Sequence, residues 1–193
     1  MALDPQSTDL LRGTNLYLIG MMGVGKSTLG RHLAAHLGYR FLDTDALVEQ
    51  VAGQSVAAVF TSLGEEAFRS LETQVVAQVS AYTRVVVATG GGIVLHSMNW
   101  SYLRHGVVVW LDVPLAELTH RLAGDRDRPL LQRPDWETHL ATLWEQRRPL
   151  YASADIHLPI AAAEAPEAIA QRLLTLLPTR LRPDPRQSTA ADN

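Results

Sequence analysis

A glycine-rich stretch near the start of the chain has the residues needed to hold a nucleotide. Residues 20–27 read GMMGVGKS and match the pattern G-x-x-x-x-G-K-[ST], after an apolar run and before a helical pattern. In such a phosphate-binding loop (P-loop), backbone N–H groups surround phosphates at a helix N-terminus, where the helix dipole favours anions. The lysine would reach the outer phosphates, and the serine hydroxyl would bind Mg²⁺. The sequence therefore predicts a purine-triphosphate site, with ATP as the expected nucleotide of a kinase, formed by Gly23, Val24, Gly25, Lys26, Ser27 and Thr28.

A second glycine-rich stretch raises a separate question, because the P-loop already serves the nucleotide phosphates. Residues 88–94 read ATGGGIV and follow a strand-like run of valines. Glycine is used where a ligand must approach the backbone closely, and a tight turn is the simpler alternative. A tight turn needs only one or two glycines. We therefore expect this stretch to lie at the end of a strand and to face a second ligand.

Acidic and basic residues near these loops suggest partners for that ligand. Asp43 and Asp45 follow the second strand, and their spacing allows one to face a metal and the other a substrate hydroxyl; helix capping is the alternative. Arg69 has helical spacing to Glu65, Glu66 and Glu72, which also fits a solvated salt-bridge face. Arg147 lies near the C-terminal end of another helical pattern, where a cation interacts favourably with the helix dipole. Taken singly, each arginine fits a structural role as well as a binding role.

Apolar runs and helical patterns alternate along the chain. We expect strands at 15–19, 40–42, 85–87, 107–111 and 156–158, and helices at 27–37, 46–80 (broken near Gly53 and Gly64), 114–123, 136–150 and 166–177. Strands separated by helices predict β-α-β units and a parallel sheet covered on both faces. Trp110 falls in the fourth strand and is expected in the core. The fold class is therefore α/β.

Composition limits the possible functions. The chain has 193 residues, a formal net charge of −3 and no cysteine, which excludes disulfides and thiolate metal sites and gives no sign of a nucleic-acid partner. No apolar run is long enough for a membrane span, and residues 1–13 resemble neither a signal nor a transit peptide. We expect one domain at 13–177, disordered ends at 1–12 and 178–193, a mobile lid at about 124–135, and a cytoplasmic monomer.

The P-loop by itself leaves several classes open, including GTPase switches, motor ATPases and small-molecule kinases. The chain is too short for a motor. It has no N-K-x-D-like stretch for guanine recognition and no Ras-like D-x-x-G after a strand. A small kinase with a lid is the class that these observations favour.

Five further stretches follow GMMGVGKST in a fixed order: FLDTD, GEEAFRSLE, ATGGGIV, DRPLL and RRPLY. With this set, the chain resembles the shikimate kinases from about residue 15 to residue 151, and more weakly to about residue 177. The resemblance implies a three-layer α/β/α P-loop fold of the nucleoside-monophosphate-kinase type. Its five-stranded parallel sheet would have the order 2-3-1-4-5.

The resemblance also implies roles for individual residues. The substrate carboxylate would be held by two arginines, a task suited to a bidentate guanidinium fork, and a carboxylate would accept hydrogen bonds from the substrate diol. The lid arginine would close over the transferring phosphoryl group. The implied substrate residues are Asp45, Phe60, Phe68, Arg69, Gly91, Gly92 and Arg147, on the helices at about 44–80 and beyond; the implied nucleotide residues are Arg121 and Arg128, and the implied Mg²⁺ residues are Ser27 and Asp43.

The implied reaction transfers the γ-phosphoryl group of ATP to the 3-hydroxyl of shikimate, with Lys26, Asp45 and Arg128 as catalytic residues. Shikimate 3-phosphate made in this way belongs to chorismate and aromatic amino acid biosynthesis. The alternatives are a gluconate or nucleotide kinase of the same fold, or a non-catalytic kinase-like binding module.

Three features fit the resemblance less directly. Residues 160–165 (IAAAEA) lack the arginine that this family often has near adenine. Asp112 ends an apolar run as a P-loop metal ligand does, but a helix-start role before Pro114 is the simpler interpretation. His32 and His36 have metal-compatible spacing, and we expect them to be a surface pair.

Overall fold

The computed structural model describes residues 10–124 and 129–179. Five parallel strands form one sheet in the order β2-β3-β1-β4-β5. This confirms the predicted fold class and strand order. The strands are β1 (Asn15–Ile19), β2 (Arg40–Asp43), β3 (Val85–Ala88), β4 (Gly106–Asp112) and β5 (Ile156–Pro159).

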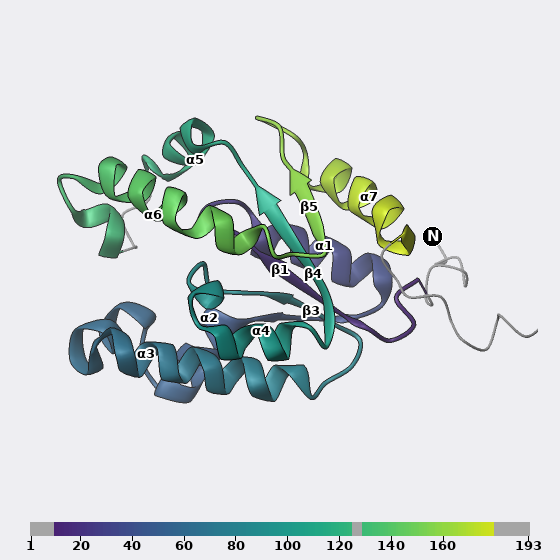
Figure 1. Ribbon diagram of the computed structural model, residues 1–193, viewed down its shortest axis with the longest axis horizontal. Helices are drawn as coiled ribbons and strands as arrows, with labels where there is room; N and C mark the ends of the chain where they lie inside the picture. The colour runs from purple at the N-terminus through teal and green to yellow at the C-terminus, as the bar shows by residue number, and fades with distance from the viewer. Residues whose placement is uncertain (1–9, 125–128, 180–193) are drawn as a thin grey trace, which may run out of the picture.

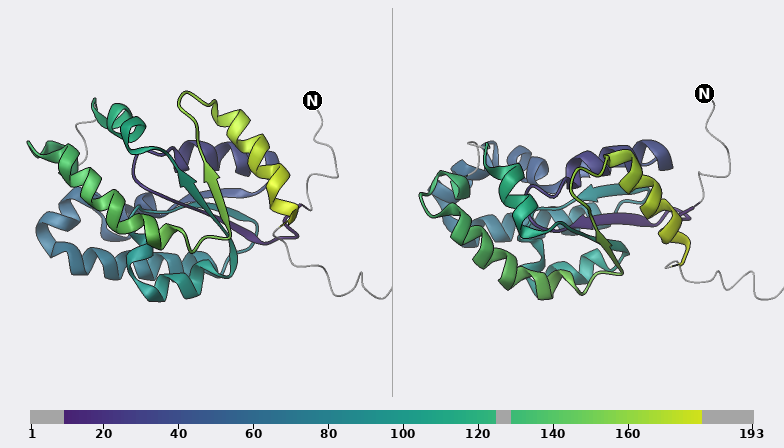
Figure 2. Two further views of the ribbon diagram at one scale, coloured as in Figure 1. Left: turned by 45° about the horizontal axis from the view of Figure 1, so that its top comes forward. Right: turned by 90° about the horizontal axis from the view of Figure 1, so that it is seen from above.

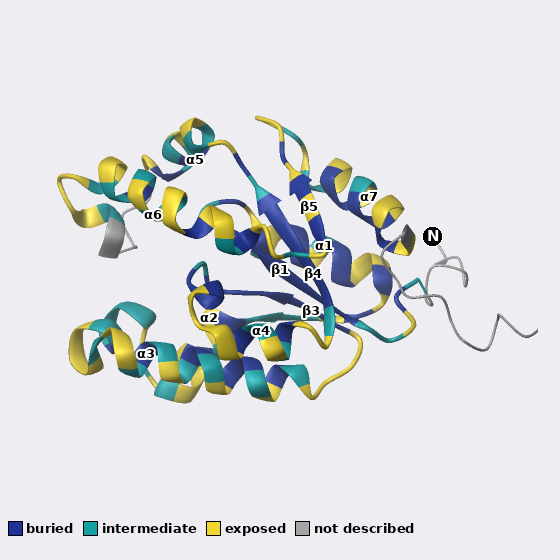
Figure 3. Cartoon of the chain, in the orientation of Figure 1, coloured by how far each residue is buried: buried dark blue, intermediate teal, exposed yellow. Residues whose placement is uncertain are grey.

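The central strands are apolar throughout, because both faces of the sheet are covered. Every residue of β1 and β3 is buried, and so are the five residues 107–111 of β4. Figure 3 shows these strands in the colour of buried residues, between helices whose outer sides are exposed. Continuous Val, Ile and Leu runs are typical of parallel strands of this kind. Trp110 is 6% exposed, as expected for a core residue.

Helices form the outer two layers. The helix α1 (Lys26–Leu37) packs with α7 (Pro166–Leu176) on one face, and α4 (Ser97–Leu103) and α6 (Trp136–Tyr151) lie on the other (Figures 1 and 2). The helices α2 (Thr44–Ala52) and α3 (Val56–Ser80) pack against each other after β2, and α5 (Leu115–Leu122) follows β4. None of the helices in the described part of the chain is long and apolar enough to span a membrane.

The helical region at 46–80 breaks where glycines were expected to break it. Gly53 ends α2 in a left-handed conformation, and Gly64 interrupts α3 with φ 82° and ψ 173°. The short helices at 93–95 and 97–103 were not predicted. Three-residue and seven-residue helices give too few turns for a periodic apolar pattern to show in the sequence.

The described domain extends slightly beyond the predicted bounds of 13 and 177. Leu11 is fully buried in the core, and Leu177 begins a short 3₁₀ helix (Leu177–Thr179). A start at residue 13 was therefore too late, since a buried leucine precedes it. The predicted disordered ends otherwise fall on residues 1–9 and 180–193, which lie outside the described residues, as do residues 125–128 of the predicted lid.

Candidate active site

The P-loop joins β1 to α1. Gly25 adopts φ 96° directly before α1, so the loop turns over the N-terminus of this helix. Lys26, the only lysine of the chain, is buried, and its Nζ donates hydrogen bonds to the carbonyl oxygens of Gly20 and Met21, both at 2.8 Å. Its ammonium group therefore lies inside the loop, where backbone N–H groups and the helix dipole also favour an anion.

Asp43 connects the P-loop helix with the start of α2. Its Oδ2 accepts a hydrogen bond from the Ser27 hydroxyl at 2.6 Å, and its Oδ1 accepts one from the Asp45 backbone N–H at 3.1 Å. The second bond makes Asp43 the N-cap of α2, so the capping interpretation is confirmed. The first bond places a carboxylate beside the hydroxyl that the P-loop pattern offers to a metal.

A cleft of about 230 Å³ lies over the C-terminal ends of the strands. It is lined by the P-loop, by both aspartates and by the start of the second glycine stretch: Met22, Gly23, Gly25, Lys26, Ser27, Thr28, Asp43, Asp45, Thr89 and Gly91. Ligands of open α/β sheets bind at this edge. The structure thus brings the two glycine stretches together in one cleft, although 60 residues (28–87) separate them in the sequence.

Arg69 lies beside the triple glycine and is held by two carboxylates. It pairs with Glu72 through Nη1 and with Glu65 through Nη2 at 3.2 Å. Burial alone would lower the pKa of Arg69, but the two carboxylates outweigh this effect and raise it. Among the three glutamates at helical spacing from Arg69, the two that form ion pairs with it are Glu65 and Glu72. The guanidinium is fixed in one orientation rather than free in solvent.

Phe60 and Phe68 form an apolar wall next to this arginine. Their ring centroids are 4.4 Å apart, and the Arg69 guanidinium lies 5.2 Å from the Phe68 ring centroid and 5.9 Å from that of Phe60. Eight residues of straight helix would separate the two rings by roughly 12 Å along the axis. The interruption at Gly64 lets Phe60 fold back onto Phe68.

Arg147 reaches the same place from the opposite side of the site. It lies on α6 and is 8% exposed, which is unusual for an arginine. A Cβ atom on Gly91 would be 3.6 Å from Arg147 Nη1, so the guanidinium lies next to the glycine backbone. Arg69 and Arg147 therefore converge on the triple glycine from two helices that are distant in sequence.

The three glycines make room for charged side chains. A Cβ atom on Gly90 would lie 2.6 Å from both Asp45 Oδ1 and Glu72 Oε1, and one on Gly92 would lie 2.7 Å from Arg69 Cζ. None of these glycines has a positive φ, so the backbone conformation does not demand glycine. The space for a side chain at Gly92 is filled by Arg69 itself, and not left open for a ligand as we expected; only Gly91 leaves ordinary contact distances.

Glu72 lies at the centre of this charged group. It is 1% exposed, and burial raises the pKa of Glu72 while Arg69 opposes the shift. The nearby Asp45 carboxylate raises the pKa of Glu72 further, and Arg147 lowers it. We had considered Glu72 only as a salt-bridge partner of Arg69. Its full burial and its electrostatic interaction with charges on both sides of the site follow from tertiary packing, and helical spacing alone gives no sign of them.

Several buried polar atoms here lack a protein partner among the described residues. They include Arg69 Nε, Arg147 Nε and Glu72 Oε1. Buried polar groups are nearly always hydrogen-bonded to protein, water or ligand. Two arginine donors without acceptors, next to a glycine backbone, suit an anionic ligand such as a carboxylate.

Of the two remaining residues predicted to bind the nucleotide, the structure describes only Arg121. Arg121 lies on α5 and pairs with Glu117 at 2.8 Å; its neighbour Leu122 packs against Gly23 of the P-loop. This helix therefore adjoins the P-loop, and the role of Arg121 stays a prediction. Arg128 lies outside the described residues. In the loop at 160–165, Glu164 is bound by Arg172 at 2.9 Å.

Two other sequence interpretations can now be assessed. Asp112 was expected to start α5, which is wrong: the N-cap is Pro114, and Asp112 Oδ2 instead lies at hydrogen-bond distance, 2.8 Å, from His157 Nε2. His32 and His36 lie on the surface of α1 as expected, and His32 is 3.5 Å from Glu167. The described residues contain no group of three or more side chains suited to a metal ion.

Fold and site together define a class of protein. A P-loop at the head of a 2-3-1-4-5 parallel sheet, with a second polar subsite in the same cleft, is the arrangement of a P-loop kinase for a small molecule. The family model described as "Shikimate kinase" matches residues 22–178. The chain therefore belongs to the shikimate kinase family.

Individual relatives agree with this assignment. The chain is 55% identical over 173 residues to a shikimate kinase of Thermosynechococcus vestitus, covering 90% of this chain and 94% of that protein. It is 53% identical over 172 residues to one of Synechococcus elongatus, covering 89% and 90%. A solved structure described as shikimate kinase from Acinetobacter baumannii in complex with shikimate has a TM-score of 0.83 at 36% identity, covering 90% of this chain and 97% of that one.

Proposed function

We propose that this enzyme transfers the γ-phosphoryl group of ATP to the 3-hydroxyl of shikimate, releasing ADP and shikimate 3-phosphate. Family membership supports the reaction class. The observation in this chain that carries the choice of acceptor is the convergence of Arg69 and Arg147 on the triple glycine, with the Nε atoms of both buried and without a protein acceptor. A ligand carboxylate would supply those acceptors.

On the nucleotide side, the P-loop would bind the ATP phosphates. Lys26 would exchange its hydrogen bonds to loop carbonyls for contacts with the outer phosphates, which carry more negative charge. Arg121 and Arg128 would add positive charge from α5 and the lid, as the family resemblance implies. Phosphoryl transfer depends mainly on alignment and neutralisation of charge, so these cations would lower the barrier without forming covalent bonds.

The residues at the P-loop fit a magnesium ion. Ser27 and Asp43 present oxygen atoms 2.6 Å apart at the edge of the cleft, and Mg²⁺ prefers oxygen ligands and retains several waters. Ser27 would bind the ion directly and Asp43 through water. The bound ion would supply positive charge that neutralises part of the phosphate charge.

On the acceptor side, Asp45 would orient the reacting hydroxyl. It lines the cleft and lies against Gly90, between the P-loop and the two arginines. Asp45 would accept a hydrogen bond from the substrate diol, and Phe60 and Phe68 would contact the apolar ring face. Gly91 and Gly92 would present their backbone to the substrate. This arrangement would align the 3-hydroxyl with the γ-phosphate across one cleft.

A comparison of acceptors tests the proposal. ADP release would be measured with a coupled assay on shikimate, gluconate and nucleoside monophosphates, each with ATP and Mg²⁺. We expect turnover of shikimate alone, because two arginines beside a glycine backbone suit a cyclic polyol carboxylate. Turnover of gluconate or of a nucleoside monophosphate, with no turnover of shikimate, would support a different kinase. ATP and shikimate binding without turnover would support a non-catalytic module.

A further inference from the structure

The backbone conformation of the second glycine stretch must be fixed by contacts with other parts of the chain. Residues 89–92, called the acceptor loop below, include three consecutive glycines, and glycine leaves the backbone the widest conformational freedom. The loop nevertheless lies against four charged side chains with little spare room, since Asp45, Glu72, Arg69 and Arg147 all approach it closely. A loop that contributes its backbone to a ligand must hold that backbone in one orientation.

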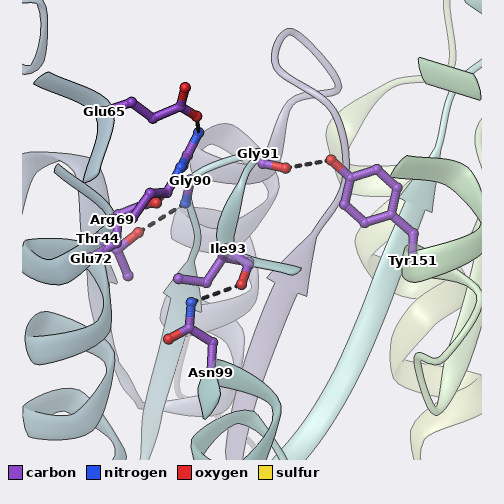
Figure 4. A network of polar contacts seen from close by, with 9 residues as sticks. All are labelled: Thr44, Glu65, Arg69, Glu72, Gly90, Gly91, Ile93, Asn99 and Tyr151. Atoms are coloured by element: carbon purple, nitrogen blue, oxygen red, sulfur yellow. Dashed lines mark hydrogen bonds and ion pairs between the residues drawn. The ribbon is translucent and has the colours of Figure 1, made fainter. Parts of the chain in front are cut away.

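Side chains from two different helices hold the loop from opposite sides (Figure 4). On one side, the Gly90 N–H donates to the Thr44 hydroxyl oxygen at 2.9 Å. On the other side, the Tyr151 hydroxyl donates to the Gly91 carbonyl oxygen at 2.6 Å. Thr44 is fully buried and Tyr151 is 1% exposed, so water cannot easily replace either bond.

The bond from Tyr151 determines where the next N–H group points. The peptide joining Gly91 and Gly92 is planar and trans, so its C=O and N–H point in opposite directions. With the carbonyl directed at Tyr151, the Gly92 N–H points away from that side chain. Within the described part of the chain, neither Gly91 nor Gly92 donates its N–H to a protein acceptor.

Tyr151 also connects the loop to the second arginine. Arg147 and Tyr151 are four residues apart on α6, so they lie on the same face of the helix. One hydrogen bond therefore sets the position of Arg147 relative to the acceptor loop as well as the orientation of the Gly91–Gly92 peptide. Thr44 has the matching role beside Asp45, its neighbour at the start of α2.

We propose that Thr44 and Tyr151 are positioning residues for the acceptor: their hydroxyl groups fix the acceptor loop so that its backbone and the two arginines form one site. The inference rests on the proposed function and deepens it. The Thr44 hydroxyl accepts from the Gly90 N–H and the Tyr151 hydroxyl donates to the Gly91 carbonyl oxygen, so both act on the loop backbone, and we assign neither of them a contact with the substrate.

The test compares Michaelis constants for both substrates in variants that remove only a hydroxyl function. For Tyr151→Phe we expect the KM for shikimate to rise by about tenfold and the KM for ATP to change less than about twofold, as the loss of one buried hydrogen bond implies. Thr44→Val should produce the same selective rise, and Thr44→Ser, which keeps the hydroxyl, should restore values close to wild type.

Tyr17→Phe is the matched control. Tyr17 is fully buried on β1 and packs near Gly106 at the opposite end of the sheet, and its hydroxyl has no hydrogen-bond partner among the described residues, so its loss should change neither KM and should not lower thermal stability. The inference would be overturned if the wild type is active on shikimate but neither Tyr151→Phe nor Thr44→Val raises the KM for shikimate more than the KM for ATP. The proposed function would then remain intact. If Tyr151→Phe does not fold, the Thr44 pair decides. Wild-type protein inactive on shikimate would overturn both.

Discussion

At the scale of single residues, the site depends on charged side chains that burial forces into fixed positions. Arg147 is 8% exposed and Glu72 is 1% exposed, and Arg69 is locked between two carboxylates. Buried charges are costly unless they are paired, so the pairs among these residues are needed for the site to exist at all. Positions 90 and 92 have no room for a larger residue, because these charged side chains occupy the space that a Cβ atom would need.

Gly92→Ala should therefore act through Arg69. The new Cβ would overlap the guanidinium and displace it, which should lower kcat/KM for shikimate by about 10- to 100-fold, the typical cost of a lost charged hydrogen bond. Steady-state kinetics of Gly92→Ala, Arg69→Ala and the double variant would measure this. Because both changes remove the same contact, the double variant should be no worse than Arg69→Ala; additive losses would contradict the account.

Tyr151 should make the unfolding free energy of the protein depend on pH in the alkaline range. Burial raises the pKa of Tyr151 to about 12, from 10.0 in the unfolded chain. A raised pKa means that folding favours the protonated form, so this contribution is complete below pH 10 and is lost as pH rises through 12. Relative to Tyr151→Phe, the unfolding free energy of the wild type should fall by up to about 1.4 kcal/mol per pH unit in this range.

Urea unfolding of both proteins between pH 9 and pH 12 would measure the difference. Lys26 and the four other tyrosines are present in both proteins, so the comparison cancels any contribution that they make in this range. Parallel stability curves for the two proteins would show that the Tyr151 hydroxyl is not buried as described.

At the scale of elements, the interruption of α3 shapes the acceptor side. Gly64 has φ 82° and ψ 173°, a region that is essentially restricted to glycine, and in sequence it lies between Phe60 and Phe68, whose tilted rings contact each other next to Arg69. The glycine has no neighbouring atom within 4 Å of a would-be Cβ, so its requirement is conformational and not steric. The bend makes one helix supply both the apolar wall and the first arginine.

Gly64→Ala should lower the unfolding free energy by roughly 1–3 kcal/mol and should also raise the KM for shikimate, because Phe60 would leave Phe68. Gly38→Ala is the control: Gly38 ends α1 with φ 67° and also has open space around it, so a loss of roughly 1–2 kcal/mol is expected there, with KM unchanged. Urea unfolding and steady-state kinetics measure both effects. An unchanged KM in Gly64→Ala would mean that the bend does not shape the acceptor site.

The elements also show why some structure was predictable and some was not. β3 and β4 could be predicted because parallel strands buried on both faces leave continuous valine runs in the sequence. The α4 sequence SMNWSYL gives no such pattern, since it is short and half of it faces solvent. Asp112 was misassigned because its partner His157 is distant in sequence and adjacent only in the sheet.

At the scale of the whole molecule, the C-terminal edge of the sheet brings the P-loop and the second glycine stretch into one cleft. The P-loop was predictable because its residues are contiguous and its mechanism is local to one strand-to-helix turn. The residues of the acceptor side come from α2, α3, the acceptor loop and α6, and only their family resemblance grouped them in advance. Thr44, Glu72 and Tyr151 act through contacts that no local pattern encodes. The expected monomeric state and cytoplasmic location stay predictions.

The central claim is that Arg69 and Arg147 select the acceptor by its carboxylate. We would measure kcat/KM for shikimate and for its methyl ester, which has lost the negative charge, in the wild type and in Arg147→Ala. Arg148→Ala, on the adjacent and half-exposed residue, is the matched control.

The wild type and Arg148→Ala should prefer shikimate over the ester by about 100-fold or more, whereas Arg147→Ala should lose at least about tenfold of this preference, because a buried charge pair contributes about 2–4 kcal/mol. Arg147→Ala should also raise the KM for shikimate far more than the KM for ATP. If Arg147→Ala discriminates between acid and ester as strongly as the wild type, Arg147 does not bind the carboxylate and the account is wrong.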